Sequence, residues 1–452
     1  QQTIIAVIPV YNIGGALNRN STTRTNQNGP KAYGFRGNAR NYDLNRDFIK
    51  ADSKNAQAFT KIFRTLRPAL FIDNHVSNGA DYQYTLTHLF TQHNKLGGAL
   101  GNYLHQTFMP ALEDSLAQKN WDITPYVNVF NSTPDQGFNQ FFDSPRYSTG
   151  YTTLFNTLGM MVETHMLKPY KKRVEGTYEL MKTFIAIAEK EAEQIKKLSR
   201  YSKSRYPVGG SYPISWKIDS SKTTMLNFKG YTGTQVSSKV THSDRLKYDR
   251  NLPFTKKVAY QNYYLPDKEI RIPESYIVPK GWWRIVELLK LNQIEMIPIK
   301  KDTIIEATVY KIENFQTVQN PYEGHYLHYN TQVSSKKERV QVSAGDYRIT
   351  TQQEGIRYLL ETLEPSATDS FFNWNFFDTI LQQKEGFSPY VWEDKAFELL
   401  ENDPVLQKEF ERKKTKDPLF AKNAYEQLDW IHKQSDHYEK AHLRYPILRI
   451  GD

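Results

Sequence analysis

The residues best suited to chemistry lie in one segment, Phe35 to Phe48, with the sequence FRGNARNYDLNRDF. The segment places three arginines and three asparagines around Asp43: Arg36, Arg40, Arg46, Asn38, Asn41 and Asn45. A guanidinium group binds carboxylates or phosphates in a planar two-pronged geometry, and asparagine amides add orienting hydrogen bonds. The segment therefore predicts a site for an anionic group. On composition alone, a solvated turn with surface ion pairs is an equal alternative.

Two further candidates stand at the ends of short apolar runs. His75 closes the run ALFIDNH, and Glu163 closes the run LGMMVE. In open α/β sheets, ligands bind outside the carboxyl ends of the strands, so both positions are well placed for function. A carboxylate at the end of a buried strand has a raised pKa and can act as a general base. The alternatives are a structural histidine and a carboxylate that a helix N-terminus satisfies.

The elements that must position these residues alternate between strand-like and helical patterns up to about residue 200. This alternation predicts an α/β fold with a mixed, mostly parallel sheet and helices on both faces. A polar loop at residues 12–41 is long enough to be typical of a functional segment. The expected strands are residues 3–10 (TIIAVIPV), 69–75 and 158–163, and the expected helices are residues 52–67 and 170–197.

A change in composition and in the expected secondary structure near residue 200 predicts two domains. The segment LSRYSKSRYPVGGS at residues 198–211 is polar, basic and marked by glycine and proline, which suits a boundary. Residues 1–200 are expected to form the domain with the candidate site. Residues 201–452 are expected to form an accessory α+β domain that is rich in strands and ends in a charged helical tail at 394–442.

Composition excludes several classes of site and partner. Lys and Arg total 59 against 49 Asp and Glu, which gives a net charge of +10, but the basic residues form no stripe, so no nucleic-acid partner is predicted. The chain has no cysteine, which excludes disulfides, thiolate metal sites and a cysteine nucleophile. No apolar run approaches the roughly 18 residues that span a bilayer, so no transmembrane segment is predicted.

In order and local context, five of the candidate residues resemble the carboxypeptidase A-like zinc metallopeptidases: Arg36, Asn45, Arg46, His75 and Glu163. The segment YDLNRDF matches the family's Asn-Arg element closely and is the most specific part of the resemblance. NHVS around the histidine and MVETH around the glutamate are weaker matches in the expected order. The resemblance covers about the first 200 residues. It implies a zinc carboxypeptidase-like fold that is N-terminally incomplete, and an enzyme that hydrolyses C-terminal peptide bonds.

The resemblance also implies a catalytic role for three of these residues. Arg36 would stabilise the oxyanion of the tetrahedral intermediate. His75 would be a ligand of one Zn²⁺ ion, and Glu163 would take a proton from the zinc-bound water.

The implied substrate is a peptide with a free C-terminal carboxylate. Asn45 and Arg46 would hold that carboxylate, according to the resemblance. A tyrosine on a mobile loop before the glutamate is a further feature of the family. Tyr147 and Tyr151 both qualify, and Tyr147 is preferred as the substrate-binding residue.

The chain departs from the family pattern in the metal site. The family's first two zinc ligands come from an HxxE motif, and none of the eleven histidines here is followed by a glutamate three residues later. Only 35 residues precede Arg36, so we expect the motif, with the other two protein ligands, upstream of Gln1. The chain as given is then expected to be inactive without that segment. The alternative is a relative that has lost its metal.

Two other functions fit the same residues. One is a zinc amidohydrolase that acts on cell-wall peptides or N-acyl amino acids. The other is a non-catalytic relative in which Arg36 and Arg46 bind a carboxylate without cleaving the molecule. Export is common in the family, so the resemblance implies a secreted or periplasmic protein, and no signal peptide is visible in the sequence.

Overall fold

A four-stranded mixed sheet forms the centre of the first part of the chain. The structure is a computed structural model that describes residues 3–202 and 205–452. The strand order is β1-β5-β2-β3; β1 pairs with β5 and β2 with β3 in parallel, whereas β2 and β5 are antiparallel. The predicted α/β architecture with a mixed sheet is thereby confirmed. The strands are β1 (Leu70–Ser77), β2 (Leu86–Phe90), β3 (Ile123–Pro125) and β5 (Leu158–His165).

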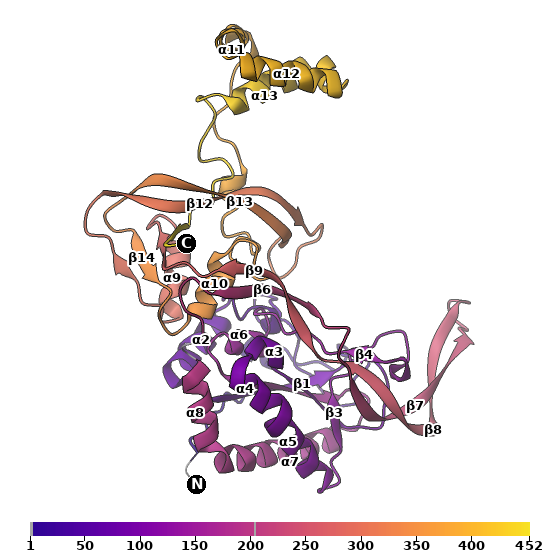
Figure 1. Ribbon diagram of the computed structural model, residues 1–452. Helices are drawn as coiled ribbons and strands as arrows, with labels where there is room; N and C mark the ends of the chain where they lie inside the picture. The colour runs from indigo at the N-terminus through magenta and orange to yellow at the C-terminus, as the bar shows by residue number, and fades with distance from the viewer. Residues whose placement is uncertain (1–2, 203–204) are drawn as a thin grey trace.

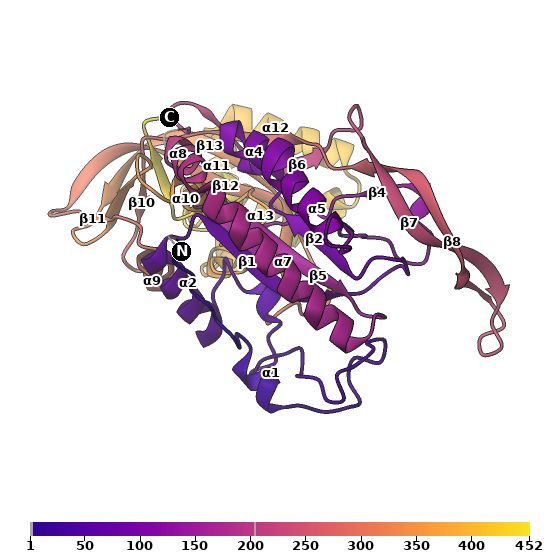
Figure 2. The same cartoon turned by 90° about the horizontal axis from the view of Figure 1, so that it is seen from below.

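Helices pack on both faces of this sheet, and Figure 2 shows α7 across the face that is turned to the viewer. Leu158 and Met160 of β5 share a hydrophobic cluster with Leu112 of helix α5 and with Phe184 of α7. Helices α2 and α6 belong to a second cluster, which also includes Phe71 of β1. The helices of this part are α1 (Ile13–Leu17), α2 (Lys54–Leu66), α3 (His93–Leu96), α4 (Gly98–Tyr103), α5 (Met109–Ala117), α6 (Ser148–Thr153), α7 (Tyr170–Lys190) and α8 (Ala192–Ser202).

The strand predicted at residues 3–10 is wrong. These residues have no regular secondary structure, and the side chain of Ile4 is 94% exposed. A strand is stabilised by hydrogen bonds to a neighbouring strand, and no strand in the described part of the chain pairs with this run. The apolar composition that predicted a buried strand therefore lacks the partner that would bury it.

Antiparallel strands are the commonest regular structure in the second part of the chain. The long hairpin β7–β8 projects from the body of the molecule in Figure 1, and its base pairs with the short strand β4 of the first part. A six-stranded sheet has the order β11-β14-β10-β15-β12-β13. The strands outside the central sheet are β4 (Phe138–Asn139), β6 (Ser211–Ile218), β7 (Thr224–Ser237), β8 (Asp244–Gln261), β9 (Tyr264–Arg271), β10 (Ser275–Val278), β11 (Ile297–Pro298), β12 (Thr303–Thr317), β13 (His328–Val342), β14 (Tyr347–Thr350) and β15 (Leu448–Ile450).

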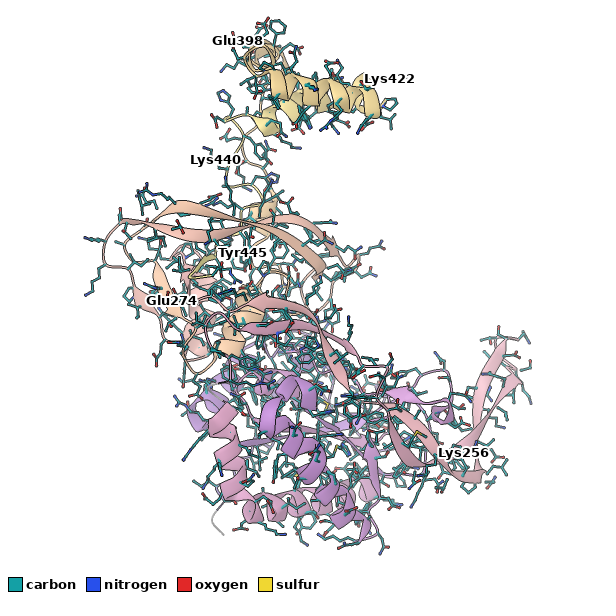
Figure 3. The ribbon with its side chains drawn as sticks, in the orientation of Figure 1. Lys256, Glu274, Glu398, Lys422, Lys440 and Tyr445 are labelled. Carbon is teal, nitrogen blue, oxygen red and sulfur yellow. The ribbon has the colours of Figure 1, made fainter. Side chains whose placement is uncertain are left out.

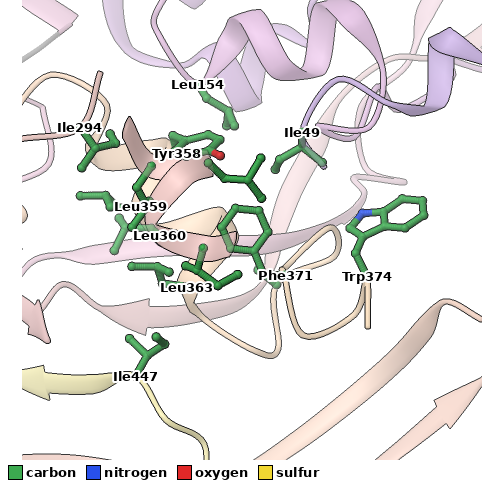
Figure 4. Close-up of a cluster of buried hydrophobic side chains, with 14 of the residues drawn as sticks. Ile49, Leu154, Ile294, Tyr358, Leu359, Leu360, Leu363, Phe371, Trp374 and Ile447 are labelled. Carbon is green, nitrogen blue, oxygen red and sulfur yellow. The ribbon is translucent and has the colours of Figure 1, made fainter. Parts of the chain in front are cut away.

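One hydrophobic core joins the two parts. Figure 4 shows Ile49 and Leu154 of the first part beside Tyr358 and Phe371 of the second. Tyr358 belongs to helix α10 (Ile356–Leu363), which is buried along its whole length. The parts are therefore packed against each other directly, and the boundary predicted at residue 200 stays a prediction.

Helices occupy most of the predicted charged tail, although they begin at residue 389 and end at 434, and they form a lobe of their own. Helices α11 (Pro389–Asn402), α12 (Pro404–Lys416) and α13 (Ala424–Gln434) stand apart from the body in Figure 1, around a separate apolar cluster. Figure 3 shows Glu398 and Lys422 on this lobe and Lys440 in the segment that leads back to the body. The remaining helix is α9 (Trp283–Leu291). Within the described ranges, no helix is long and apolar enough to cross a membrane.

Candidate functional site

The central pair of the site lies on neighbouring parallel strands. His75 of β1 and Glu163 of β5 are direct partners in the strand register, near the carboxyl ends of both strands. Parallel strands bring the residues at their carboxyl ends to the same edge of a sheet, which is where α/β folds bind ligands. The fold therefore brings together two residues that are 88 positions apart in the sequence (163 − 75).

His75 is held by a carboxylate from its own strand. Its Nε2 lies 2.8 Å from Oδ2 of Asp73, two residues earlier on the same face of β1. Burial alone would lower the pKa of His75, but the charge and hydrogen bond of Asp73 outweigh burial and raise it to about 9, with a further contribution from Glu163. No described residue forms a hydrogen bond with the other ring nitrogen of His75, Nδ1.

Glu163 has a buried oxygen without a partner. No group in the described ranges hydrogen-bonds to its Oε2. Burial raises the pKa of Glu163 to about 7, the nearby Asp73 adds to this effect, and the charges of His75, Arg36 and Arg46 oppose it. A carboxyl group with a pKa near neutrality can both accept and return a proton, which is the property required of a general acid and base.

Two arginines reach the site from the predicted anion-binding segment. Arg36 contacts Oδ2 of Asp43 through Nε and through Nη2, each at 2.8 Å. Arg46 lies 3.9 Å from the same oxygen. Asp43 also caps the short helix η1 (Leu44–Arg46) by accepting a hydrogen bond from the amide of Asn45. One carboxylate therefore holds both guanidinium groups and the backbone between them.

Asn45 and Tyr147 complete the predicted substrate-binding group. The Arg46 guanidinium lies 4.6 Å from the centroid of the Tyr147 ring, in a cation–π geometry. Oδ1 of Asn45 is buried and has no hydrogen-bond partner among the described residues. Tyr147 is the N-cap residue of α6 and is partly exposed. Tyr151, the other tyrosine considered, is fully buried and hydrogen-bonds to Asn292, so it lies in the core.

Three residues beside the site were not predicted as site residues. Asp73 could have been found, because residues two apart on a strand share a face. Burial and the charge of Glu163 raise the pKa of Tyr126, which follows β3 and hydrogen-bonds to Asn78. Glu323, from the connection between β12 and β13, accepts a hydrogen bond from the Asp43 amide at 2.8 Å. The sequence carried no pattern that indicated Tyr126 or Glu323.

The described residues fit a zinc site in part. His75 offers a ligating nitrogen, and the unpartnered oxygen of Glu163 lies beside it in the register. A catalytic zinc site normally has three protein ligands and one open position. Within residues 3–202 and 205–452, no group of three or more histidine, aspartate and glutamate side chains is arranged to hold a metal ion. The residues present therefore match one ligand and the neighbouring carboxylate of such a site.

Comparison of this chain with protein-family models, with curated proteins and with solved structures found no match in any of the three.

Proposed function

We propose that the protein is a zinc-dependent metallocarboxypeptidase whose first 200 residues have a zinc carboxypeptidase-like fold. The observation that carries the proposal is the pairing of His75 with Glu163 at the carboxyl ends of two parallel strands. Glu163 is buried, its Oε2 has no hydrogen-bond partner among the described residues, and the charges of Arg36 and Arg46 act to lower its pKa. A proton acceptor and a candidate ligand therefore lie side by side, and the charges of two guanidinium groups act on the acceptor.

In this proposal, each of the site residues has a separate role in binding or catalysis. Arg46, with Asn45, holds the terminal carboxylate of the peptide, because a guanidinium forms strong charge-assisted hydrogen bonds with carboxylates. Arg36 faces the scissile carbonyl and stabilises the negative charge that develops on its oxygen. Glu163 accepts a proton from the attacking water and returns it to the leaving amine. Tyr147 covers the Arg46 guanidinium and limits the volume available to the substrate.

His75 is the residue that would hold zinc among those described, with Asp73 orienting its ring. A bound zinc ion supplies Lewis-acid polarisation and lowers the pKa of water to about 7. The remaining ligands of the ion are part of the proposal and have no counterpart in the described ranges.

The test is release of a C-terminal amino acid from N-blocked dipeptides by the full-length protein, with one equivalent of Zn²⁺ and after chelation. Matched dipeptides with a C-terminal amide serve as the control. We expect zinc-dependent release from the free acid and little from the amide. Absence of hydrolysis from both, with the metal bound, would refute the proposed activity. Equal hydrolysis of both would refute the carboxylate clamp.

A further inference from the structure

A turn from the second part of the chain lies against the arginine-rich segment of the site. Tyr322 and His325 exchange backbone hydrogen bonds of 2.7 and 3.1 Å, which place Glu323 and Gly324 at the tip. The tip residues have φ angles of 51° and 80°, as a type I′ turn requires. A glutamate is uncommon in the left-handed region, so contacts around the turn must stabilise this conformation.

The two residues that flank the tip supply such contacts. Nε2 of His325 lies 2.7 Å from Oδ2 of Asp52, at the end of the loop that carries the site arginines. The Tyr322 ring stacks on Trp374, with centroids 6.0 Å apart and planes 22° from parallel. The Arg146 guanidinium lies 5.6 Å from the centroid of the same tyrosine. The turn is therefore fixed to both parts of the molecule.

The carboxylate of Glu323, at the tip of the turn, is hydrogen-bonded through only one of its two oxygens among the described residues. Oε2 of Glu323 accepts the hydrogen bond from the Asp43 amide, just before the helix that ends at Arg46. Among the described residues, no side chain forms an ion pair with Glu323 and none hydrogen-bonds to its Oε1. The nearby cation Lys50 is already paired with two other carboxylates, each at 2.8 Å. Among the described residues Glu323 therefore has no ion-pair partner, and the charges of Lys50 and Arg46 act on it only from a distance.

We propose that this turn forms one wall of the substrate site and that Glu323 selects peptides whose C-terminal residue has a cationic side chain. The inference rests on the proposed function, in which Arg46 holds the terminal carboxylate. Glu323 binds the backbone three residues before Arg46, so its free oxygen lies beside the terminal residue of a peptide held there. An ammonium or guanidinium group on that residue would gain a charge-assisted hydrogen bond. An acidic side chain would meet repulsion.

The experiment compares the binding of two nearly isosteric ligands by calorimetry, Nα-acetyl-lysine and Nα-acetyl-norleucine. The full-length chain, Glu323→Gln and Glu398→Gln are measured in parallel. We expect the unaltered chain to bind the lysine ligand about tenfold more tightly. Glu323→Gln should remove this difference, because it deletes the charge while its amide oxygen can still accept the Asp43 hydrogen bond. Glu398→Gln, on the exposed surface of the helical lobe, should preserve the difference.

Three results would overturn the inference: equal affinities in the unaltered chain, a lysine preference that survives Glu323→Gln, or no binding of either ligand. The measurement needs no turnover, so its outcome is separate from that of the hydrolysis test. If the protein fails to hydrolyse peptides but shows a lysine preference that depends on Glu323, the proposed role of Glu323 in binding is supported and the proposed activity is not. Hydrolysis without that preference would remove the role of Glu323 and leave the proposed activity intact.

Discussion

At the scale of single residues, the charged groups that β1, β5 and the arginine-rich segment bring to the candidate site are held by oppositely charged partners, with one exception. Asp43 lies against Arg36 and Arg46, and Asp73 lies against His75. Glu163 has no such partner at hydrogen-bonding distance among the described residues, and its Oε2 is buried. Burying a carboxyl group without a hydrogen bond is unfavourable for folding, so its position is better explained by chemistry than by stability.

Glu163→Gln tests this explanation directly. The amide has the same shape but cannot accept a proton from water, so we expect turnover to fall by a factor of about 100 or more. Binding of a non-cleaved ligand should stay within about twofold, because no proposed binding contact is removed. The measurements are kcat from dipeptide hydrolysis and ligand affinity from calorimetry, both on the full-length protein, with Glu398→Gln as the control. Full activity in Glu163→Gln would remove this residue from the mechanism.

Arg46→Ala separates binding of the carboxylate from catalysis. A hydrogen bond to a charged group contributes about 1.5–3 kcal/mol, so we expect a loss of roughly tenfold or more in affinity for ligands with a free terminal carboxylate. Affinity for the matched C-terminal amides should change much less. The readout is the ratio of acid to amide affinity in Arg46→Ala and in the unaltered chain. Equal losses on both ligands would show that Arg46 acts on the site in another way.

Part of this site could be predicted from the sequence. Whether a residue could be predicted depends on whether its contacts are local in the chain. Arg46 and Glu163 were predictable because each lies in a short segment with a recognisable local pattern. Asp73 follows from the alternation of side chains along a strand, once His75 is chosen. Glu323 was not predictable, because its contact with Asp43 joins positions 280 apart and depends on how the two parts pack. Local patterns contain no information on such a contact.

At the scale of elements, the expected strands and helices are present where another element of the fold packs against them. The run at residues 158–163 became the fully buried strand β5, between β1 and β2. The helix predicted at residues 52–67 is α2, which begins after Ser53 as N-cap and ends at the left-handed Arg67. The apolar run at residues 3–10 failed as a strand because hydrophobicity alone does not provide a neighbour.

The segment before α6 carries a prediction of pH-dependent stability. Burial raises the pKa of Asp143 to about 6, from an ordinary value of 3.8, and the nearby charge of Lys95 opposes this effect. The stability that this group contributes is fully present below pH 3.8 and is lost as pH rises through about 6. Asp143→Asn has no charge to bury, so it should be more stable than the unaltered chain above pH 6, by about 3 kcal/mol at most.

The check is the free energy of unfolding in urea for Asp143→Asn and the unaltered chain between pH 4 and pH 8. The difference should approach zero near pH 4 and level off above pH 6. Asp244→Asn, an exposed position at the start of β8, is the matched control and should show little change across this range. A stabilisation of Asp143→Asn that does not depend on pH would mean that ionisation of Asp143 is not the cause.

At the scale of the whole molecule, one core holds both parts together, and Tyr445 and Ile447, just before the last strand, are part of it. Strand β15 pairs with β10 and β12, and Arg449 on this strand forms a buried ion pair with Glu364 at 2.5 Å. The hydroxyl of Tyr445, labelled in Figure 3, donates a hydrogen bond to the carbonyl of Leu363. The helical lobe is inserted before these residues, so the chain leaves the body and returns to it.

This arrangement predicts that the lobe can be removed while the end of the chain cannot. Replacing residues 386–438 by a short glycine-serine linker should leave the body folded, because the amide of Glu385 already lies 3.1 Å from a carboxylate oxygen of Glu439. The apolar cluster of the lobe is separate, so its removal opens no cavity in the shared core. Truncation after Glu385 should unfold the body, because it deletes Tyr445 and β15 with the lobe.

The readouts are the near-ultraviolet circular dichroism of the body, the urea midpoint of unfolding, and affinity for Nα-acetyl-lysine. We expect the excised chain to keep its urea midpoint and to bind the ligand with an affinity within about twofold of the unaltered chain. A loss of near-ultraviolet signal in the excised chain would show that the lobe is needed for folding of the body. Retained structure but lost binding would instead mean that the lobe contributes to the site, which the separation of the lobe from the body in Figure 1 argues against.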